Sequence, residues 1–173
     1  MQKLLAAIAV LAIAACSPQK RAQVQVDLSK KLSPGCYTVD LFDPYRLEYP
    51  EAGVPAEASK FLGVWKNGAW GGHWCHDLYI TKAYPDGTVD LLDAYGPNRK
   101  SGDEAVVFKR KGKVENGVLT FFSRRQAPVS YRIVDGYLLG ERIDAFGKHE
   151  ITMSRERKVA IVPIPPVKPS RRS

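Results

Sequence analysis

From Phe61 onward, short runs of β-forming residues alternate with signals for tight turns. The dipeptides Asp86-Gly87, Asn116-Gly117 and Asp135-Gly136 favour the positive φ angles of two-residue hairpin loops, and Phe146-Gly147 marks a further turn. The predicted strands are Phe61–Lys66, His73–Ala83, Thr88–Tyr95, Glu104–Val114, Val118–Ser123, Val129–Val134, Tyr137–Ile143 and Lys148–Ser154. Eight consecutive strands without a helical pattern among them predict an all-β fold, a single eight-stranded antiparallel up-and-down barrel, with an eight-stranded sandwich as the alternative.

Alternation within these runs assigns side chains to the two faces of the sheet. In the second run, one face holds Trp74, His76, Leu78 and Ile80, and the other holds Cys75, Asp77, Tyr79 and Thr81. The candidates for lining a barrel pocket, or for filling a core, are Trp65, Trp74, His76, Phe108, Phe121, Tyr131 and His149. A barrel of eight strands holds at most one small ligand, and so many large aromatic side chains favour a mostly filled interior.

The segments outside the barrel run, residues 61–154, differ from it in composition. Residues 36–60 are rich in proline, which predicts an extended strap packed on the barrel, with a short strand at Cys36–Phe42 and one helical turn near Pro55–Lys60. Residues 16–35 are polar and basic, and residues 155–173 are basic and proline-rich. These two arms are predicted to be a flexible tether and a disordered tail.

The first residues have the pattern of an export signal. Lys3 precedes the apolar run Leu4–Ile13, which is too short to span a bilayer, and small residues follow it. Ile13-Ala14-Ala15-Cys16 resembles the lipobox of bacterial lipoproteins. The resemblance implies that residues 1–15 are a signal peptide and that Cys16 becomes an N-terminus carrying fatty acyl chains such as palmitate. Two or more such chains anchor a protein stably in a membrane.

The residue after this cysteine bears on location, since an aspartate there favours retention at the inner membrane in the enterobacterial pattern. Ser17 occupies the position instead. We therefore expect a cell-envelope protein attached to the outer membrane and facing the periplasm, with the inner membrane as the alternative. An ordinary secretory signal with an unrelated cysteine is the other interpretation of this end of the chain.

The formal net charge of +8 is unevenly distributed. It divides into +1 for Lys3, +3 for residues 17–35, +5 for residues 155–173 and −1 for residues 36–154. A nucleic-acid-binding domain carries its positive charge on the fold, so no nucleic-acid partner is expected. Basic arms of this kind keep a chain soluble or lie along an anionic surface.

If Cys16 is acylated, Cys36 and Cys75 remain as the other cysteines of the chain. An exported compartment permits a disulfide between them, which would join the strap to the second strand. Two free buried thiols are the alternative. Pairing requires a Cα separation of roughly 4.4–6.8 Å.

A further resemblance comes from the first predicted hairpin. Gly63-Val64-Trp65 resembles the Gly-x-Trp motif of lipocalins, in which the tryptophan closes the bottom of an eight-stranded barrel. The later motifs, in order, are similar to a group of uncharacterised bacterial lipocalin-like (calycin-type) domains: Trp70-Gly71-Gly72, Cys75-His76, Asp86-Gly87-Thr88, Tyr95-Gly96, Gly112-Lys113-Val114, Gly117-Val118-Leu119 and Val129-Ser130-Tyr131-Arg132. The resemblance covers Pro55 to Arg155, and beyond Met153-Ser154-Arg155 the chain has no clear counterpart of the arginine-containing motif that lipocalins carry near the last strand. It implies a barrel but no particular activity.

Metal binding is not expected, although His73, Cys75 and His76 lie together in the sequence. Zinc needs three or four converging ligands, and His73 and His76 point to opposite faces of a strand. Trp70-Gly71-Gly72 is predicted to be a turn, and phosphate-binding glycine loops are absent, so no cofactor is expected.

Catalysis is not expected either. The chain has no Gly-x-Ser-x-Gly motif, and a His76 or His149 base would need a carboxylate from a neighbouring strand, because Asp77 and Glu150 face away. The sequence therefore predicts a lipid-anchored, non-enzymatic envelope protein that binds a small apolar ligand or an envelope component. The alternatives are a structural or partner-binding accessory with a filled barrel and, third, a small hydrolase-like enzyme.

Overall fold

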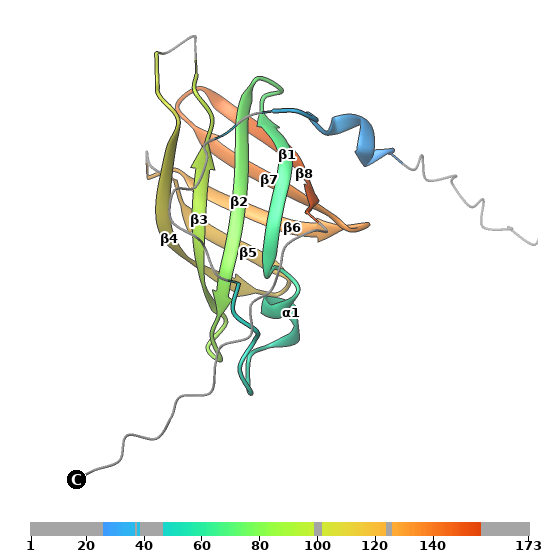
Figure 1. Ribbon diagram of the computed structural model, residues 1–173, viewed down its shortest axis with the longest axis vertical. Helices are drawn as coiled ribbons and strands as arrows, with labels where there is room; N and C mark the ends of the chain where they lie inside the picture. The colour runs from blue at the N-terminus through green and yellow to red at the C-terminus, as the bar shows by residue number, and fades with distance from the viewer. Residues whose placement is uncertain (1–25, 37, 39–46, 99–101, 124–125, 157–173) are drawn as a thin grey trace, which may run out of the picture.

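Eight antiparallel strands close into a barrel in the computed structural model of the chain, which describes residues 26–36, 38, 47–98, 102–123 and 126–156 (Figure 1). The strands are β1 (Gly63–Trp70), β2 (Trp74–Ala83), β3 (Thr88–Tyr95), β4 (Val106–Glu115), β5 (Val118–Phe122), β6 (Pro128–Val134), β7 (Tyr137–Asp144) and β8 (Gly147–Arg155). Each strand pairs with the next, and β1 pairs with β8. The predicted up-and-down barrel is confirmed, and the sandwich alternative is excluded.

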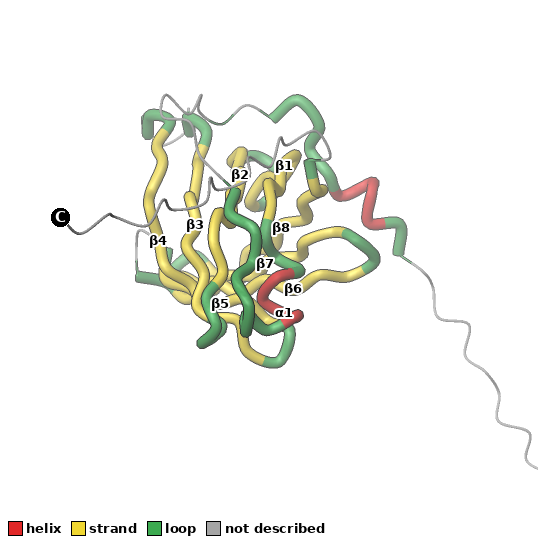
Figure 2. The backbone as a smooth tube through the Cα atoms, turned by 60° about the horizontal axis from the view of Figure 1, so that its bottom comes forward, coloured by secondary structure: helices red, strands yellow, loops and turns green. Residues whose placement is uncertain are grey.

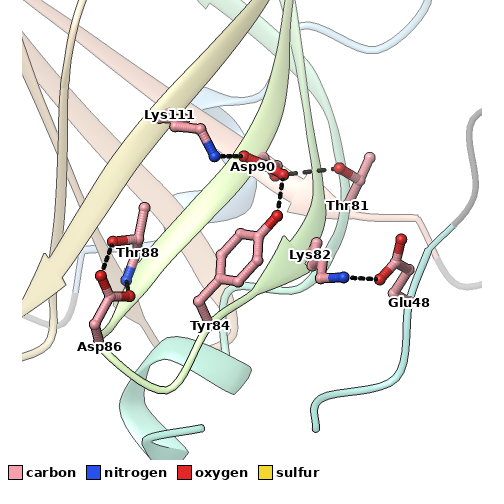
Figure 3. Close-up of polar contacts among 8 residues, drawn as sticks. All are labelled: Glu48, Thr81, Lys82, Tyr84, Asp86, Thr88, Asp90 and Lys111. Carbon is pink, nitrogen blue, oxygen red and sulfur yellow. Dashed lines mark hydrogen bonds and ion pairs between the residues drawn. The ribbon is translucent and has the colours of Figure 1, made fainter.

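The tight turns have the backbone that the sequence predicts. Asn116 and Gly117 have φ angles of 52° and 73°, and Asp135 and Gly136 have φ angles of 50° and 81°. Gly87, at the β2–β3 turn, has a φ of 83°. In that turn the Asp86 carboxylate accepts hydrogen bonds from the backbone N–H of Thr88 at 2.8 Å and from its hydroxyl at 2.7 Å (Figure 3). Hairpin turns with positive φ therefore set the strand order.

The first strand is longer than predicted. It begins at Gly63 and continues to Trp70, whereas the sequence predicts Phe61–Lys66. The continuation passes through a β-bulge between Trp65 and Gly68, at which Asn67 has a φ of 61°. The bulge at Asn67-Gly68 therefore shifts the pairing register of β1 without ending the strand. The predicted turn at Trp70-Gly71-Gly72 follows directly.

Part of the strap lies among the described residues. The helical turn predicted near Pro55–Lys60 is present as α1 (Ala56–Ser59), whereas the strand predicted at Cys36–Phe42 lies mostly outside the described residues. Glu48 donates its backbone N–H to Thr81 O at 2.8 Å. Its carboxylate pairs with Lys82 at 2.7 Å (Figure 3). Leu47 is buried on the outer face of the barrel with Val64, Tyr79 and Ala94. The described part of the strap thus covers the outside of β1–β3.

Cys36 and Cys75 form a disulfide with a Cα separation of 5.4 Å, which confirms the predicted pairing. The segment before Cys36 contains η1, a 3-10 helix at Leu28–Lys31 that packs beside β8. The backbone N–H of Ser33 donates to Asn67 O at 2.7 Å, and Thr38 donates to the Asp77 carboxylate at 2.8 Å. These contacts hold the N-terminal segment against the outside of β1 and β2.

The two ends of the barrel differ. We call the end that carries α1 the closed end, and it comes forward in Figure 2. Trp65 is fully buried there, and its Nε1 donates to Phe61 O at 2.9 Å. The guanidinium carbon of Arg155 lies 4.4 Å from the Trp65 ring centroid. The β1–β2, β3–β4, β5–β6 and β7–β8 connections surround the other end, which we call the open end.

The interior next to the closed end is filled by apolar side chains. Leu78, Ile80, Leu91, Leu119, Leu138 and Met153 are all essentially inaccessible to solvent. A β-carbon at Gly140 would lie 2.4 Å from Tyr131 and 2.6 Å from Ile151, so only glycine fits there. The predicted filled interior therefore describes this half of the barrel.

Among the described residues, no helix is long and apolar enough to cross a membrane.

The disulfide predicts a measurable contribution to stability. Replacing both cysteines, in Cys36→Ser/Cys75→Ser, should lower the free energy of unfolding by about 3–4 kcal/mol, because a loop of this length is no longer closed in the unfolded chain. Urea denaturation of the oxidised protein and the double variant measures the difference. Ser33→Ala, which keeps the backbone bond to Asn67 and the disulfide, is the control, and an equal loss in both variants would contradict this account.

Candidate functional site

Charged and aromatic side chains occupy the half of the barrel interior nearest the open end. They project inward from six strands, because inward positions alternate along each strand. We define this interior polar cluster as Trp70, Trp74, His76, Asp93, Tyr95, Arg110, Tyr131 and Arg142. The same strands carry apolar residues at their inward positions toward the closed end. The boundary between the two halves lies at the level of His76 and Tyr131.

His76 and Asp93 form the buried centre of this cluster. Both side chains are fully buried, and His76 Nε2 lies 3.5 Å from Asp93 Oδ1 and 3.1 Å from the Tyr131 hydroxyl. Burial, together with the positive charge of Arg142, lowers the pKa of His76 to about 3. Burial raises the pKa of Asp93 to about 7, although Arg110 and a Tyr95 hydrogen bond oppose that shift. Near neutral pH the histidine is therefore neutral, and Asp93 is poised between its two forms.

The two tyrosines remain protonated donors. Burial raises the pKa of Tyr95 well above its ordinary value, and the negative charge of Asp93 adds to the shift. Burial likewise raises the pKa of Tyr131. Their rings also pack in the cluster, since Tyr95 lies 4.6 Å from the His76 ring and Tyr131 stacks on Phe121 at 5.8 Å. The Tyr131 hydroxyl lies within hydrogen-bond distance of His76 Nε2, which can accept its hydrogen.

Two arginines bring positive charge into the same region. Arg110 Nε lies 3.8 Å from Asp93 Oδ2. The Arg142 guanidinium lies over the rings of Trp70 and Trp74, with centroid distances of 4.7 Å and 5.3 Å. The Nε atoms of both arginines are buried without a hydrogen-bond partner in the described part of the structure. Partly buried guanidiniums whose Nε atoms lack a hydrogen-bond partner can donate to a further polar group.

The chain of charges continues to the rim of the barrel. Arg142 Nε lies 3.6 Å from Asp144 Oδ2, and Asp144 Oδ1 lies 3.1 Å from His149 Nε2. The pKa of Asp144 is lowered, because hydrogen bonds from the Phe146 N–H and His149 and the charge of Arg142 outweigh its partial burial. An ionised Asp144 therefore connects the interior polar cluster to the turn between β7 and β8.

A small cavity opens at this end of the barrel. Its volume is about 40 Å³, and its walls include the aromatic rings of Trp74, Tyr95 and Phe108 and the charged side chains of Arg142 and Asp144. Such a volume is comparable with the space of one water molecule. A larger ligand must therefore displace side chains or occupy the mouth itself.

A larger hollow lies outside the barrel. This open groove has a volume of about 720 Å³, and it runs between Lys31 of η1 and the outer faces of β6–β8. Lys148 pairs there with Glu141 at 2.7 Å and with Glu150 at 3.1 Å, so its walls largely satisfy their own charges. The open-end cavity is the better candidate site, because it adjoins buried polar groups whose partners are incomplete.

The structure separates the residues that the sequence predicts as pocket or core. Trp65 and Phe121 are buried in the packed core, and the Trp65 position agrees with the closing role that the lipocalin resemblance implies. Trp74 and Phe108 line the open-end cavity, His76 and Tyr131 are buried directly beneath it, and His149 lies at the rim. The alternation predicted for β2 is correct, because Leu78 and Ile80 point inward with His76.

Other expected features lie apart from this site. His73 is exposed in the β1–β2 turn, with Nδ1 3.0 Å from Gly71 O, so it does not join His76. Among the described residues, no group of three or more histidine, cysteine, aspartate or glutamate side chains could hold a metal ion. Cys16 lies outside the described residues.

Sequence reasoning missed the charged half of the site, namely Asp93, Tyr95, Arg110, Arg142 and Asp144. The alternation of inward-facing and outward-facing positions along the strands could have identified these residues. Asp93 and Tyr95 continue the inward series of Val89 and Leu91, and Arg142 continues that of Leu138 and Gly140. A charged residue at an inward-facing register position is the pattern that indicates such a cluster.

Comparisons with known proteins add no name to this geometry. No protein-family model, no curated protein and no solved structure matches the chain. The site must therefore be interpreted from its own residues.

The His76–Asp93 pair predicts opposite pH dependences for two variants. Between about pH 4 and 6.5 the pair holds one proton in the folded protein, and the unfolded chain also holds one, so the pair adds no slope to wild-type stability. His76→Gln leaves a carboxyl whose pKa is raised, so stability should rise as pH falls through this range. Asp93→Asn leaves a histidine whose pKa is lowered, so stability should fall instead.

Each slope should approach 1.4 kcal/mol per pH unit, relative to the wild type. Urea denaturation at several pH values measures the three proteins. Slopes of the same sign in the two variants would show that the pKa values of His76 and Asp93 are not shifted in opposite directions.

Proposed function

We propose that this protein is a lipid-anchored envelope protein whose lipocalin-like barrel binds a small ligand at its open end. The observation that supports binding there is the cavity bounded by Trp74, Tyr95 and Phe108, with Arg142 and Asp144 in its wall. Ligand sites combine apolar walls with a few oriented polar groups. This composition suits a ligand with a flat or apolar body and one polar end.

The proposed membership of the lipocalin-like group rests on the closed end. Trp65 lies there in the Gly63-Val64-Trp65 motif, and Arg155 covers its ring while donating from Nη1 to Leu62 O at 2.8 Å. Arg155 also donates to Lys60 O. These contacts join the Gly63-Val64-Trp65 motif to the last strand at the closed end. The resemblance of Ile13–Cys16 to a lipobox, with Ser17 after the cysteine, supports the proposed location at the outer membrane, facing the periplasm.

Binding is favoured over catalysis by the placement of possible reacting groups. Ser123 lines the open-end cavity, whereas the histidine bonded to Asp144, His149, contributes to the outer groove. A hydrolytic site needs a nucleophile and a base within hydrogen-bond reach of each other. We infer that the barrel has no such activity.

A structural or partner-binding role is the second candidate. The observation that favours it is the small volume of the cavity, about 40 Å³, above a packed apolar core. In that case the interior polar cluster would only help to specify a single packing of the barrel, and no small molecule would co-purify with the protein.

Lipid anchoring is tested by Cys16→Ala. Without the thiol no acyl chain can be attached at this position, so we expect the protein to leave the membrane fraction when envelopes are washed. Fractionation followed by immunodetection measures this, and Ser17→Ala is the matched control that should stay attached. Retention of Cys16→Ala in washed membranes at the level of the control would refute the lipoprotein proposal.

Ligand binding is tested by comparing two tryptophans. We expect solvent extracts of the protein purified from its own envelope to contain a small molecule at about one per chain, by mass spectrometry. Trp74→Ala removes a cavity wall and should lower this yield at least fivefold. Trp65→Phe, at the closed end, should keep it. Equal yields from both variants, or no molecule from folded wild-type protein, would move the assignment to the second candidate.

A further inference from the structure

We propose that an apolar rim at the open end of the barrel contacts the surface of a lipid bilayer. The apolar rim consists of Phe122, Ile143 and Phe146. Their exposed fractions are 61%, 59% and 78%, which are high values for large apolar side chains. An exposed cluster of this kind marks an interaction site more often than an isolated exposed residue does.

Strand register places the three residues close together. Phe122 of β5 pairs with Pro128 of β6. The neighbour of Pro128 in β6, Val129, pairs with Arg142 of β7. Ile143 is the next residue of β7 after Arg142, so it lies on the same outward row as Phe122. Phe146 lies in the β7–β8 turn that follows Ile143. The rim therefore curves around the open end, beside the cavity that Arg142 and Asp144 help to line.

The N-terminal segment is fixed at the same end. Cys36 is bonded to Cys75, the second residue of β2, and Lys31 shares the outer groove with Gly71 and Gly72 of the β1–β2 turn. The Gly71 N–H donates to Glu150 O at 3.5 Å. Glu150 is three residues after Gly147, where β8 begins, so the β1–β2 turn lies near the β7–β8 turn. The disulfide thus prevents the tether from leaving at the closed end.

Chain length then limits how far the rim can be from the membrane. This step rests on the proposed acylation of Cys16. The ten residues from Cys16 to Val26 reach at most about 35 Å when fully extended. Because the first described residues lie beside the open end, a bilayer that holds Cys16 is within reach of the rim.

The shape of the rim favours lipid over a protein partner. A stable protein interface buries about 800 Å² on each side and needs complementary surfaces. Three side chains on the convex edge of two hairpins offer a few hundred Å² at most. A bilayer surface adapts to a convex protrusion, and phenyl rings and isoleucine insert into its outer layer. The cavity would then face the bilayer, so that its ligand enters from the lipid.

The test uses the acylated full chain, purified from its own envelope and placed in phosphatidylethanolamine–phosphatidylglycerol vesicles. In Phe146→Cys the new thiol is the free one, because the disulfide holds Cys36 and Cys75 and acylation occupies Cys16. A fluorophore on this thiol should be quenched at least threefold more by lipids brominated near the headgroup than the same fluorophore at Val134→Cys. Val134 is the matched control, since it is also apolar and exposed, at 36%, but lies at the closed end beside the β6–β7 turn.

Neighbouring residues should contribute to the contact. Adding Phe122→Ser and Ile143→Ser to the Phe146→Cys chain should reduce the quenching by at least half, because less apolar surface remains to insert. Equal quenching at positions 146 and 134 would overturn the proposal. Shielding of position 146 from aqueous iodide in native envelopes, without lipid quenching, would overturn it in favour of a protein partner.

Failure of the anchoring proposal is distinguishable from failure of the rim proposal. The intact mass of the same purified chain shows whether Cys16 carries acyl groups. If it carries none, the lipoprotein assignment fails, and quenching at position 146 in a Cys16→Ser/Phe146→Cys chain with added vesicles still decides whether the rim binds lipid.

Discussion

The barrel closes through a short seam between β1 and β8, and the rest of the structure depends on that closure. Only Trp65–Arg155 and Lys66–Ser154 are paired in register between these strands, and β1 has a bulge directly after Trp65. Side chains supply what the ladder lacks. Arg155 covers Trp65, and Asn67 Nδ2 donates to Ser154 Oγ at 2.9 Å. A closed barrel has no exposed sheet edge, so this seam also protects the chain from edge-to-edge association.

Apolar packing in the closed half of the barrel allows polar side chains to occupy the open half. The packed residues around Trp65 and Leu78 supply the hydrophobic stabilisation, so the open half can hold His76, Asp93 and two arginines at inward positions. Burying charged groups is costly, and burial shifts the pKa values of His76 and Asp93 so that each favours its neutral form. Arg110 and Arg142 face the carboxylates of Asp93 and Asp144. A site of this kind tolerates a new polar partner more readily than an apolar core does.

Much of the fold could be predicted from the sequence, because turns and alternation are local properties. Asn116-Gly117 and Asp135-Gly136 form the predicted turns, and Cys36 and Cys75 form the predicted disulfide. The bulge at Asn67 could not be distinguished from a turn by local pattern. The charged cluster depends on cross-strand register, which a single sequence does not specify. Asp93 is opposite Phe108, so it meets Arg110 only diagonally across β3 and β4.

The proposal that the open end of this barrel is a ligand site can be tested by a crystal structure of the protein purified from its own envelope, without stripping of bound molecules. We expect continuous density for a small molecule between Trp74 and Phe108, with its polar end toward Arg142. Well-ordered Trp74, Phe108 and Arg142 side chains around a cavity that contains water alone would contradict it.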